Sequence, residues 1–207
     1  MSFRGFLTAL AGGVLVCAAA SPALAQGVGP KAAGKGSTAA AAKPEARPAA
    51  PSAAMAGGAE PNLLGQFGTW GAYSATPNGK KVCFALAKPS TSKTNPPNRP
   101  RDPAYAFVST RPAEKVFNEV SIMIGYALKP GSESTLEVGG ANYAMYTQGD
   151  GLWIKNAAEE ERLVEAMRKS ADVVVKGTSA KGTETTDVFS LKGLSQALDR
   201  ISQDCRR

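Results

Sequence analysis

Residues 78–88 read Asn-Gly-Lys-Lys-Val-Cys-Phe-Ala-Leu-Ala-Lys, and this stretch decides the fold. Its opening Asn-Gly pair favours a tight β-turn, because both residues tolerate a positive φ. After the turn, Val82, Phe84 and Leu86 share one side of an extended chain, and the cysteine and two alanines between them share the other. The stretch therefore predicts a β-hairpin whose second strand covers Lys81–Lys88.

The rest of the domain repeats this pattern of short β-branched and aromatic runs between turn signals. Gly139-Gly140 and residues 179–182 are predicted as two further hairpin turns. A long loop is predicted from Pro89 to Pro103, since this segment is rich in Pro, Ser and Asn. The predicted strands are Gln66–Tyr73, Lys81–Lys88, Tyr105–Thr110, Val116–Leu128, Thr135–Val138, Asn142–Thr147, Leu152–Lys155, Asp172–Gly177 and Thr185–Leu191.

Two segments have helical periodicity instead. Asn156 is the predicted N-cap of a helix that extends to Ser170, with Glu159 at the capping-box position. A second helix is predicted from Leu194 to Gln203, and Cys205 falls on the same side as its apolar face. We therefore predict a mainly β fold over residues 62–207, a single β-sandwich-like domain with two short helices.

The chain has three cysteines and no histidine. Cys17 lies in an N-terminal apolar run that is predicted to be removed, so the mature chain keeps Cys83 and Cys205. In an oxidising compartment such a pair favours a disulfide. Closing so long a loop contributes about 5 kcal/mol in the chain-entropy model. We predict the Cys83–Cys205 disulfide, and two buried free thiols are the alternative.

Residues 1–25 have the pattern of a secretory signal peptide. Arg4 supplies positive charge, residues 6–20 form an apolar run, and Ala-Leu-Ala at 23–25 fits the cleavage site. A lipoprotein signal at Cys17 is the weaker alternative, because Val16 occupies a position that needs a small residue. We expect an exported protein, periplasmic or associated with the outer membrane. No later segment approaches the roughly 20 apolar residues of a membrane-spanning helix.

Residues 26–61 form a linker rich in Ala, Pro, Gly and Lys. We expect it to be disordered, because it lacks the apolar residues that offset the entropy of ordering. It would be a tether that holds the domain away from a membrane or lets it search the periplasm, and a featureless tail is the alternative. The formal net charge of +7 favours anionic partners such as outer-membrane lipid or acidic glycans, although solubility also explains it. Nucleic acid is not expected, since no recognition motif is present.

Without histidine, the chain lacks the commonest general base and metal ligand. The pairs Ser190 with Lys192 and Ser179 with Lys181 do not have the Ser-x-x-Lys spacing of serine–lysine enzymes. The three glutamates at 159–161 are expected to be surface residues that interact favourably with the helix dipole. We therefore expect a non-enzymatic protein with no catalytic residue, no cofactor and no metal site.

The predicted loop Pro89–Pro103 is the most exposed basic segment of the domain. We expect its Lys93, Arg99 and Arg101 to form a partner-binding surface, and a solvated loop without a partner is the alternative. Trp70 and Trp153 are expected in the core, although tryptophan is also common in binding hot spots.

A set of motifs follows a fixed order along the domain: Phe67-Gly68-Thr69-Trp70, Lys81-Val82-Cys83, Met123–Tyr126, Met167–Lys169, residues 176–183, residues 186–193 and a helix ending at Cys205. This set resembles the invasion-associated locus B family of alphaproteobacterial exported proteins over roughly Leu64–Cys205. The resemblance implies a periplasmic or outer-membrane-associated β-rich domain, linked in pathogenic members to entry into host cells. Many members carry a further cysteine shortly after the tryptophan, where this chain has Tyr73 and Ser74.

The residues and the resemblance together predict a non-enzymatic exported protein that does binding or structural work in the cell envelope. Its expected partner is an envelope component or a host-surface molecule, and peripheral association with a membrane is left open. Two alternatives are a surface adhesion or invasion factor that acts on host cells and a histidine-free hydrolase.

Overall fold

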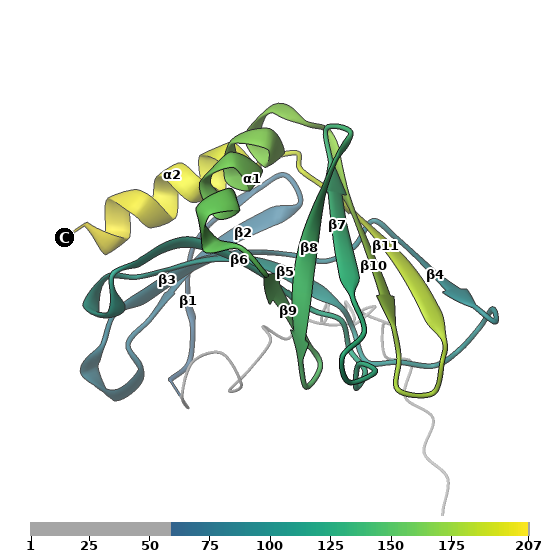
Figure 1. The fold of residues 1–207 in the computed structure, drawn as a ribbon. Helices are drawn as coiled ribbons and strands as arrows, with labels where there is room; N and C mark the ends of the chain where they lie inside the picture. The colour runs from purple at the N-terminus through teal and green to yellow at the C-terminus, as the bar shows by residue number, and fades with distance from the viewer. Residues whose placement is uncertain (1–58, 207) are drawn as a thin grey trace, which may run out of the picture. The chain divides into compact units, whose positions relative to one another are not determined.

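The computed structural model describes residues 59–206, which form one antiparallel β-sheet and two α-helices (Figure 1). The predicted signal peptide and nearly all of the predicted linker lie outside the described residues. Two short 3-10 helices, Pro77–Gly79 and Pro112–Glu114, precede β3 and β6. The other elements are β1 (Asn62–Phe67), β2 (Trp70–Ala75), β3 (Val82–Ala87), β4 (Thr91–Asn95), β5 (Tyr105–Arg111), β6 (Val116–Met123), β7 (Ser134–Val138), β8 (Ala141–Gln148), β9 (Gly151–Ile154), α1 (Ala157–Lys169), β10 (Asp172–Thr178), β11 (Glu184–Ser190) and α2 (Leu194–Cys205).

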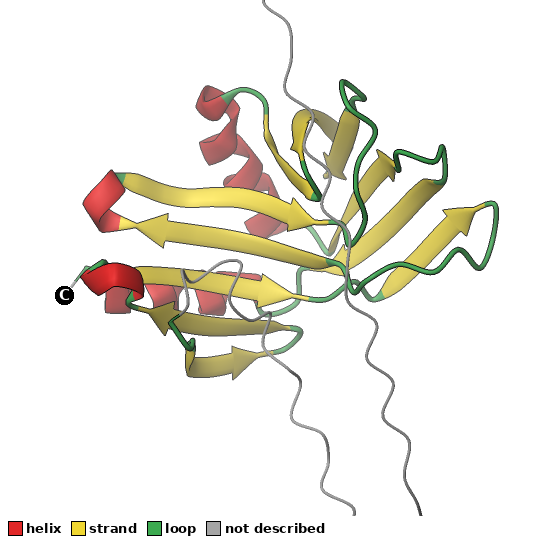
Figure 2. Ribbon diagram, turned by 90° about the horizontal axis from the view of Figure 1, so that it is seen from below, coloured by secondary structure: helices red, strands yellow, loops and turns green. Residues whose placement is uncertain are grey.

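The strands are ordered β1-β2-β3-β5-β6-β9-β8-β7-β10-β11-β4 across the sheet. Most neighbouring strands are also close in sequence, whereas β4 follows β3 in the chain but pairs with β11 at the far edge. Figures 1 and 2 show that the sheet bends, so that β3, β5 and β6 run in a different direction from β7, β8 and β10. The predicted mainly β fold with two helices is confirmed, and its strands form one continuous sheet.

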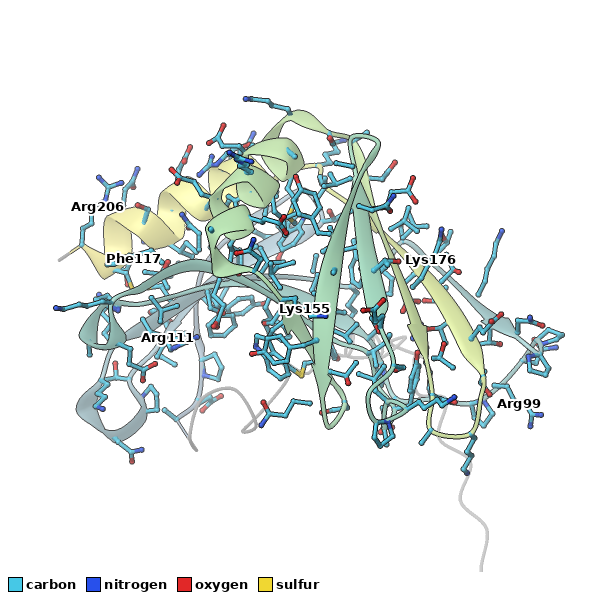
Figure 3. The ribbon with its side chains drawn as sticks, viewed as in Figure 1. Arg99, Arg111, Phe117, Lys155, Lys176 and Arg206 are labelled. Carbon is cyan, nitrogen blue, oxygen red and sulfur yellow. A yellow bond between two sulfur atoms is a disulfide. The ribbon has the colours of Figure 1, made fainter. Side chains whose placement is uncertain are left out.

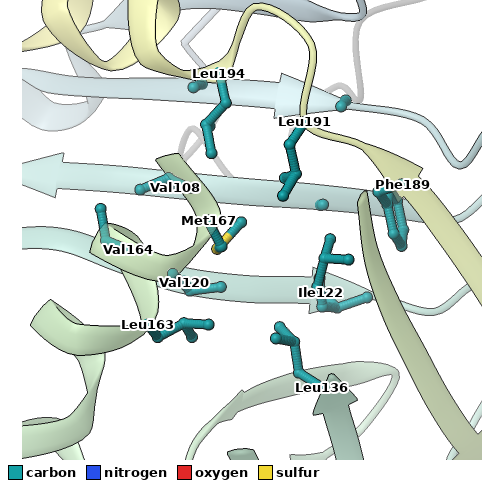
Figure 4. Close-up of a cluster of buried hydrophobic side chains, with 14 of the residues drawn as sticks. Val108, Val120, Ile122, Leu136, Leu163, Val164, Met167, Phe189, Leu191 and Leu194 are labelled. Atoms are coloured by element: carbon teal, nitrogen blue, oxygen red, sulfur yellow. The ribbon is translucent and has the colours of Figure 1, made fainter. Parts of the chain in front are cut away.

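The main hydrophobic core lies between the helices and the sheet. Helix α2 packs against β1, β2 and β3, and α1 packs against β6, β7 and β9. Figure 4 shows side chains of both helices meeting those of the strands. The core includes Trp70, Ile122, Ile124, Leu136, Met145, Leu152, Leu163, Met167, Phe189, Leu194 and Leu198, each at most 2% exposed.

Strand β3 contributes to apolar clusters on both of its faces. Cys83, Ala85 and Ala87 belong to the main core, where their small side chains let α2 lie close to the sheet. Phe84 and Leu86 face the other way and pack with Phe107 in a second cluster. The alternation predicted for this strand is therefore confirmed.

Three predicted elements are corrected. The segment Gln66–Tyr73 is not one strand, because the chain turns at Gly68, whose φ is 55°, between β1 and β2. The predicted loop Pro89–Pro103 contains strand β4, which pairs with β11 along Thr91–Asn95. Backbone hydrogen bonds hold an edge strand in place, so its side chains can all be polar. The apolar alternation that usually marks a strand in a sequence is then missing. The strand predicted over Val116–Leu128 ends at Met123.

The predicted disulfide between Cys83 and Cys205 is present, with the two Cα atoms 6.0 Å apart. It joins β3 to the last residue of α2 across a sequence separation of 122. Beside it, Lys81 Nζ lies 3.0 Å from Asp204 Oδ2. A covalent and an ionic contact therefore fix the end of α2 to the sheet. Neither α1 nor α2 has the length and apolar character of a membrane-spanning helix.

Candidate binding site

A pocket of about 470 Å³, called here the basic pocket, lies beside the edge of the sheet that β4 forms. Its walls come from β4, the loop before β5, the segment after β6, and the turn between β10 and β11. Figure 3 places Arg99 of this pocket at the opposite end of the domain from Arg206. The lining residues are Thr94, Arg99, Pro100, Arg101, Tyr126, Ala127, Ser179, Ala180, Lys181, Thr183 and Thr185.

Arg101 is largely buried and forms part of the pocket wall. Its guanidinium contacts both carboxylate oxygens of Asp187, a fully buried side chain on β11, with Nη1 2.8 Å from Oδ2. It also donates to Ser92 Oγ at 2.9 Å and to the carbonyl oxygen of Ile124 at 3.0 Å. Arg101 was expected to be an exposed contact for a partner. Its side chain is instead only 11% exposed, and it fixes the loop before β5 against β4 and β11.

Arg99 and Lys181 are the exposed cations of the basic pocket. Within residues 59–206, neither forms an ion pair. The backbone N–H of Arg99 donates to Thr94 Oγ1 at 3.2 Å, which holds the loop close to β4. Lys93, the third predicted residue, is exposed on β4 but does not line the pocket. The structure therefore brings Arg99 and Arg101 of the predicted loop together with Lys181.

Residues that carry a hydroxyl group make up much of the remaining lining. Tyr126 Oη lies 2.7 Å from Thr185 Oγ1 in a hydrogen bond. Burial raises the pKa of the Tyr126 phenol above an ordinary value of about 10 that already keeps it protonated at neutral pH. Ser179 Oγ accepts the Thr183 N–H at 3.0 Å and fixes the turn between β10 and β11. No carboxylate is among the lining residues.

Sequence reasoning missed Tyr126, Thr94 and Asp187. A signal for Asp187 was present, because it alternates with Thr185 and Phe189 on the buried side of β11. A carboxylate at such a position needs a cation or several hydrogen bonds. The identity of that cation depends on the pairing of β4 with β11, which the local sequence does not specify.

A second pocket of about 400 Å³ lies between α1 and the start of β6 and is acidic. Glu160 was expected on the surface, but it is half-buried and accepts the Val120 N–H at 2.6 Å. Burial raises the pKa of the Glu160 carboxyl above its ordinary value. Among residues 59–206, no cluster of three or more His, Cys, Asp or Glu could hold a metal ion.

Ser190 and Lys192 take part in contacts between distant segments. The Ser190 carbonyl accepts the Trp70 indole N–H at 2.9 Å, and the Lys192 carbonyl accepts the Thr69 N–H at 3.1 Å. Trp70 is fully buried, as expected, whereas Trp153 is only partly buried and stacks on Tyr146. The core prediction is therefore correct for Trp70 and too strong for Trp153.

Comparison with known proteins gives a family match. Residues 70–202 match the family model described as Invasion associated locus B (IalB) protein. The matched range includes the pocket-forming residues 94–101, 126–127 and 179–185. No curated protein and no solved structure matches the chain.

Proposed function

The chain belongs to the invasion associated locus B family, and on this premise we propose that it is an exported, non-enzymatic binding protein of the cell envelope. It recognises an envelope component through the basic pocket. The observation that carries this proposal is the pair of exposed cations, Arg99 and Lys181, set in a wall that the Arg101–Asp187, Tyr126–Thr185 and Ser179–Thr183 contacts hold in place.

The wall of the pocket is preorganised, which favours binding because little entropy is lost when a ligand enters. The contacts of Arg101 with Asp187 fix one side, and the turn bonded between Ser179 and Thr183 fixes another. Arg99 and Lys181 extend from this frame with their charges available to a ligand. An anionic envelope component is therefore the expected partner.

The non-enzymatic part of the proposal is supported by the residues available for chemistry. The chain has no histidine, and the Ser190 hydroxyl accepts the backbone N–H of Lys192 at 3.4 Å. Lys181 and Ser179 line the same pocket, but Ser179 is buried and its Oγ accepts the N–H of Thr183. A serine so placed supports the turn and is poorly placed to attack a substrate.

Capture from an envelope extract tests this proposal. The exported protein is immobilised, and the retained material is quantified for wild type and for the double variant Arg99→Glu/Lys181→Glu. A matched control, Lys80→Glu/Arg162→Glu, makes the same change in net charge at two exposed residues outside the basic pocket. We expect the pocket variant to lose most of the retained material and the control to keep it. Equal retention by both variants would refute the proposal.

A further inference from the structure

We infer that the basic pocket binds a saccharide that carries a phosphate or carboxylate group. This inference rests on the proposed function and names the chemical class of the ligand. It follows from the charge, the hydrogen-bonding groups, the apolar surface and the size of the pocket.

The charge of the pocket selects an anion. Arg99 and Lys181 contribute two positive charges that no described residue neutralises by an ion pair. The third cation, Arg101, is paired with Asp187, so this pair adds no net charge to the pocket. Because no carboxylate lines the pocket, an anionic group that enters meets attraction from both exposed cations and no opposing carboxylate in the wall.

The remaining groups fit the ring of a sugar. Thr94 and Thr183 are pocket-lining residues whose hydroxyls are only partly used: the Thr94 hydroxyl accepts the Arg99 N–H and keeps its own proton to donate. A hydroxyl can both donate and accept a hydrogen bond. Sugar hydroxyls have the same dual character, so they can pair with the hydroxyls of Thr94 and Thr183. Pro100, Ala127 and Ala180 add small apolar surfaces against which the C–H groups of a ring can pack.

The size of the pocket argues against a bare inorganic anion. About 470 Å³ falls within the range of roughly 300–1,000 Å³ that is typical of small-molecule sites. A phosphate ion alone would leave most of this space to water. The exposed large apolar side chains among the described residues, Leu63, Phe117 and Tyr146, do not line the pocket. The apolar surface of the pocket comes instead from residues such as Pro100, Ala127 and Ala180, which suit the C–H groups of a sugar ring better than an acyl chain.

Isothermal titration calorimetry of the exported protein tests this inference with four probes. These are glucose 1-phosphate, galacturonate, glucose and inorganic phosphate, each measured at the same low ionic strength. We expect at least one of the two anionic sugars to bind, and neutral glucose and inorganic phosphate to bind at least tenfold more weakly. Binding of only one anionic sugar supports the inference and identifies the acidic group.

The variants used for envelope capture separate the inference of anionic-sugar binding from the proposed function. Arg99→Glu/Lys181→Glu should weaken binding of the anionic sugar at least tenfold, and Lys80→Glu/Arg162→Glu should leave it unchanged. The inference is overturned if glucose binds as tightly as the anionic sugars, if inorganic phosphate binds as tightly as glucose 1-phosphate, or if no probe binds. In that last case, capture that still depends on the pocket would leave the proposed function standing.

Discussion

The indole N–H of Trp70 donates a 2.9 Å hydrogen bond to the carbonyl oxygen of Ser190, across a sequence separation of 120. The hydroxyl of Thr69 donates to the same carbonyl at 3.1 Å, and the Thr69 N–H donates to the carbonyl of Lys192. The first motif that carries the family resemblance, Phe67–Trp70, is thus in direct contact with the motif at residues 186–193. These motifs join the start of the sheet to the entry of α2, so their role is in the fold.

Gly193 should be intolerant of a side chain. Its φ is 95°, and a Cβ atom added there would overlap the carbonyl oxygen of Phe67. Gly182 also has a positive φ, of 79°, but a Cβ there would meet no atom within 4 Å. We expect Gly193→Ala to lower the free energy of unfolding by roughly 3 kcal/mol or more, and Gly182→Ala by about 1 kcal/mol. Urea unfolding measures both, and equal losses would contradict the close backbone approach.

Arg101 should matter for stability because of Asp187. Arg101→Met leaves the buried carboxylate of Asp187 without its cation, which typically costs about 3–5 kcal/mol of folding free energy. The double variant Arg101→Met/Asp187→Leu removes both charges and should recover most of that loss. Denaturant unfolding of wild type and the two variants measures this. A double variant as unstable as the single one would show that the ion pair does not account for the loss.

The Cys83–Cys205 disulfide should stabilise the domain strongly. Its loop of more than a hundred residues corresponds to about 5 kcal/mol in the chain-entropy model. We expect Cys83→Ala/Cys205→Ala to unfold at a much lower urea concentration than the oxidised wild type. Thiol labelling of the denatured, unreduced exported protein should label neither Cys83 nor Cys205. Labelling of both would mean that the disulfide is not formed in the exported protein.

Glu160 should give a pH dependence of stability. Burial raises the pKa of its carboxyl in the folded state, so the folded protein binds a proton more tightly than the unfolded chain does. Its contribution to stability is therefore most favourable below the unfolded pKa, and it is lost as pH rises through the folded pKa. Glu160→Gln, which keeps an oxygen that can accept the Val120 N–H, should be more stable than wild type at neutral pH.

This advantage should shrink as pH falls below the ordinary glutamate pKa of about 4.3. Glu161→Gln, at the neighbouring exposed residue, is the control and should give no such trend. Thermal unfolding between acidic and neutral pH measures the difference. Parallel pH profiles for the two variants would contradict the assignment to Glu160.

Much of the fold could be predicted because local patterns determined it. The Asn78-Gly79 pair marks the hairpin between β2 and β3, and both residues have the positive φ that the pattern favours. The Asn156 side chain accepts the Ala158 N–H at the start of α1, as predicted for an N-cap. The periodicity of α2 places Cys205 on its buried side, where it meets Cys83.

The basic pocket could be predicted only in part, because three distant segments form it. Strand β4 is a polar edge strand whose pairing with β11 depends on backbone hydrogen bonds. No local pattern indicates that Thr94 lies beside Thr185, or that Tyr126 reaches the same place. The charge of the predicted loop Pro89–Pro103 made it a candidate binding surface. The burial of Arg101 in this loop could not be predicted, because it depends on its ion pair with Asp187 of β11.

Photo-crosslinking in intact cells tests most directly whether the basic pocket binds an envelope component. Benzoylphenylalanine is placed at Ala180, an exposed residue that lines the pocket, or at Ala113, an exposed residue outside it. We predict a crosslinked product from Ala180→benzoylphenylalanine that disappears when Arg99→Glu/Lys181→Glu is added, and none from the Ala113 variant. Absence of a product at Ala180, or an equal product at Ala113, would contradict binding at this pocket.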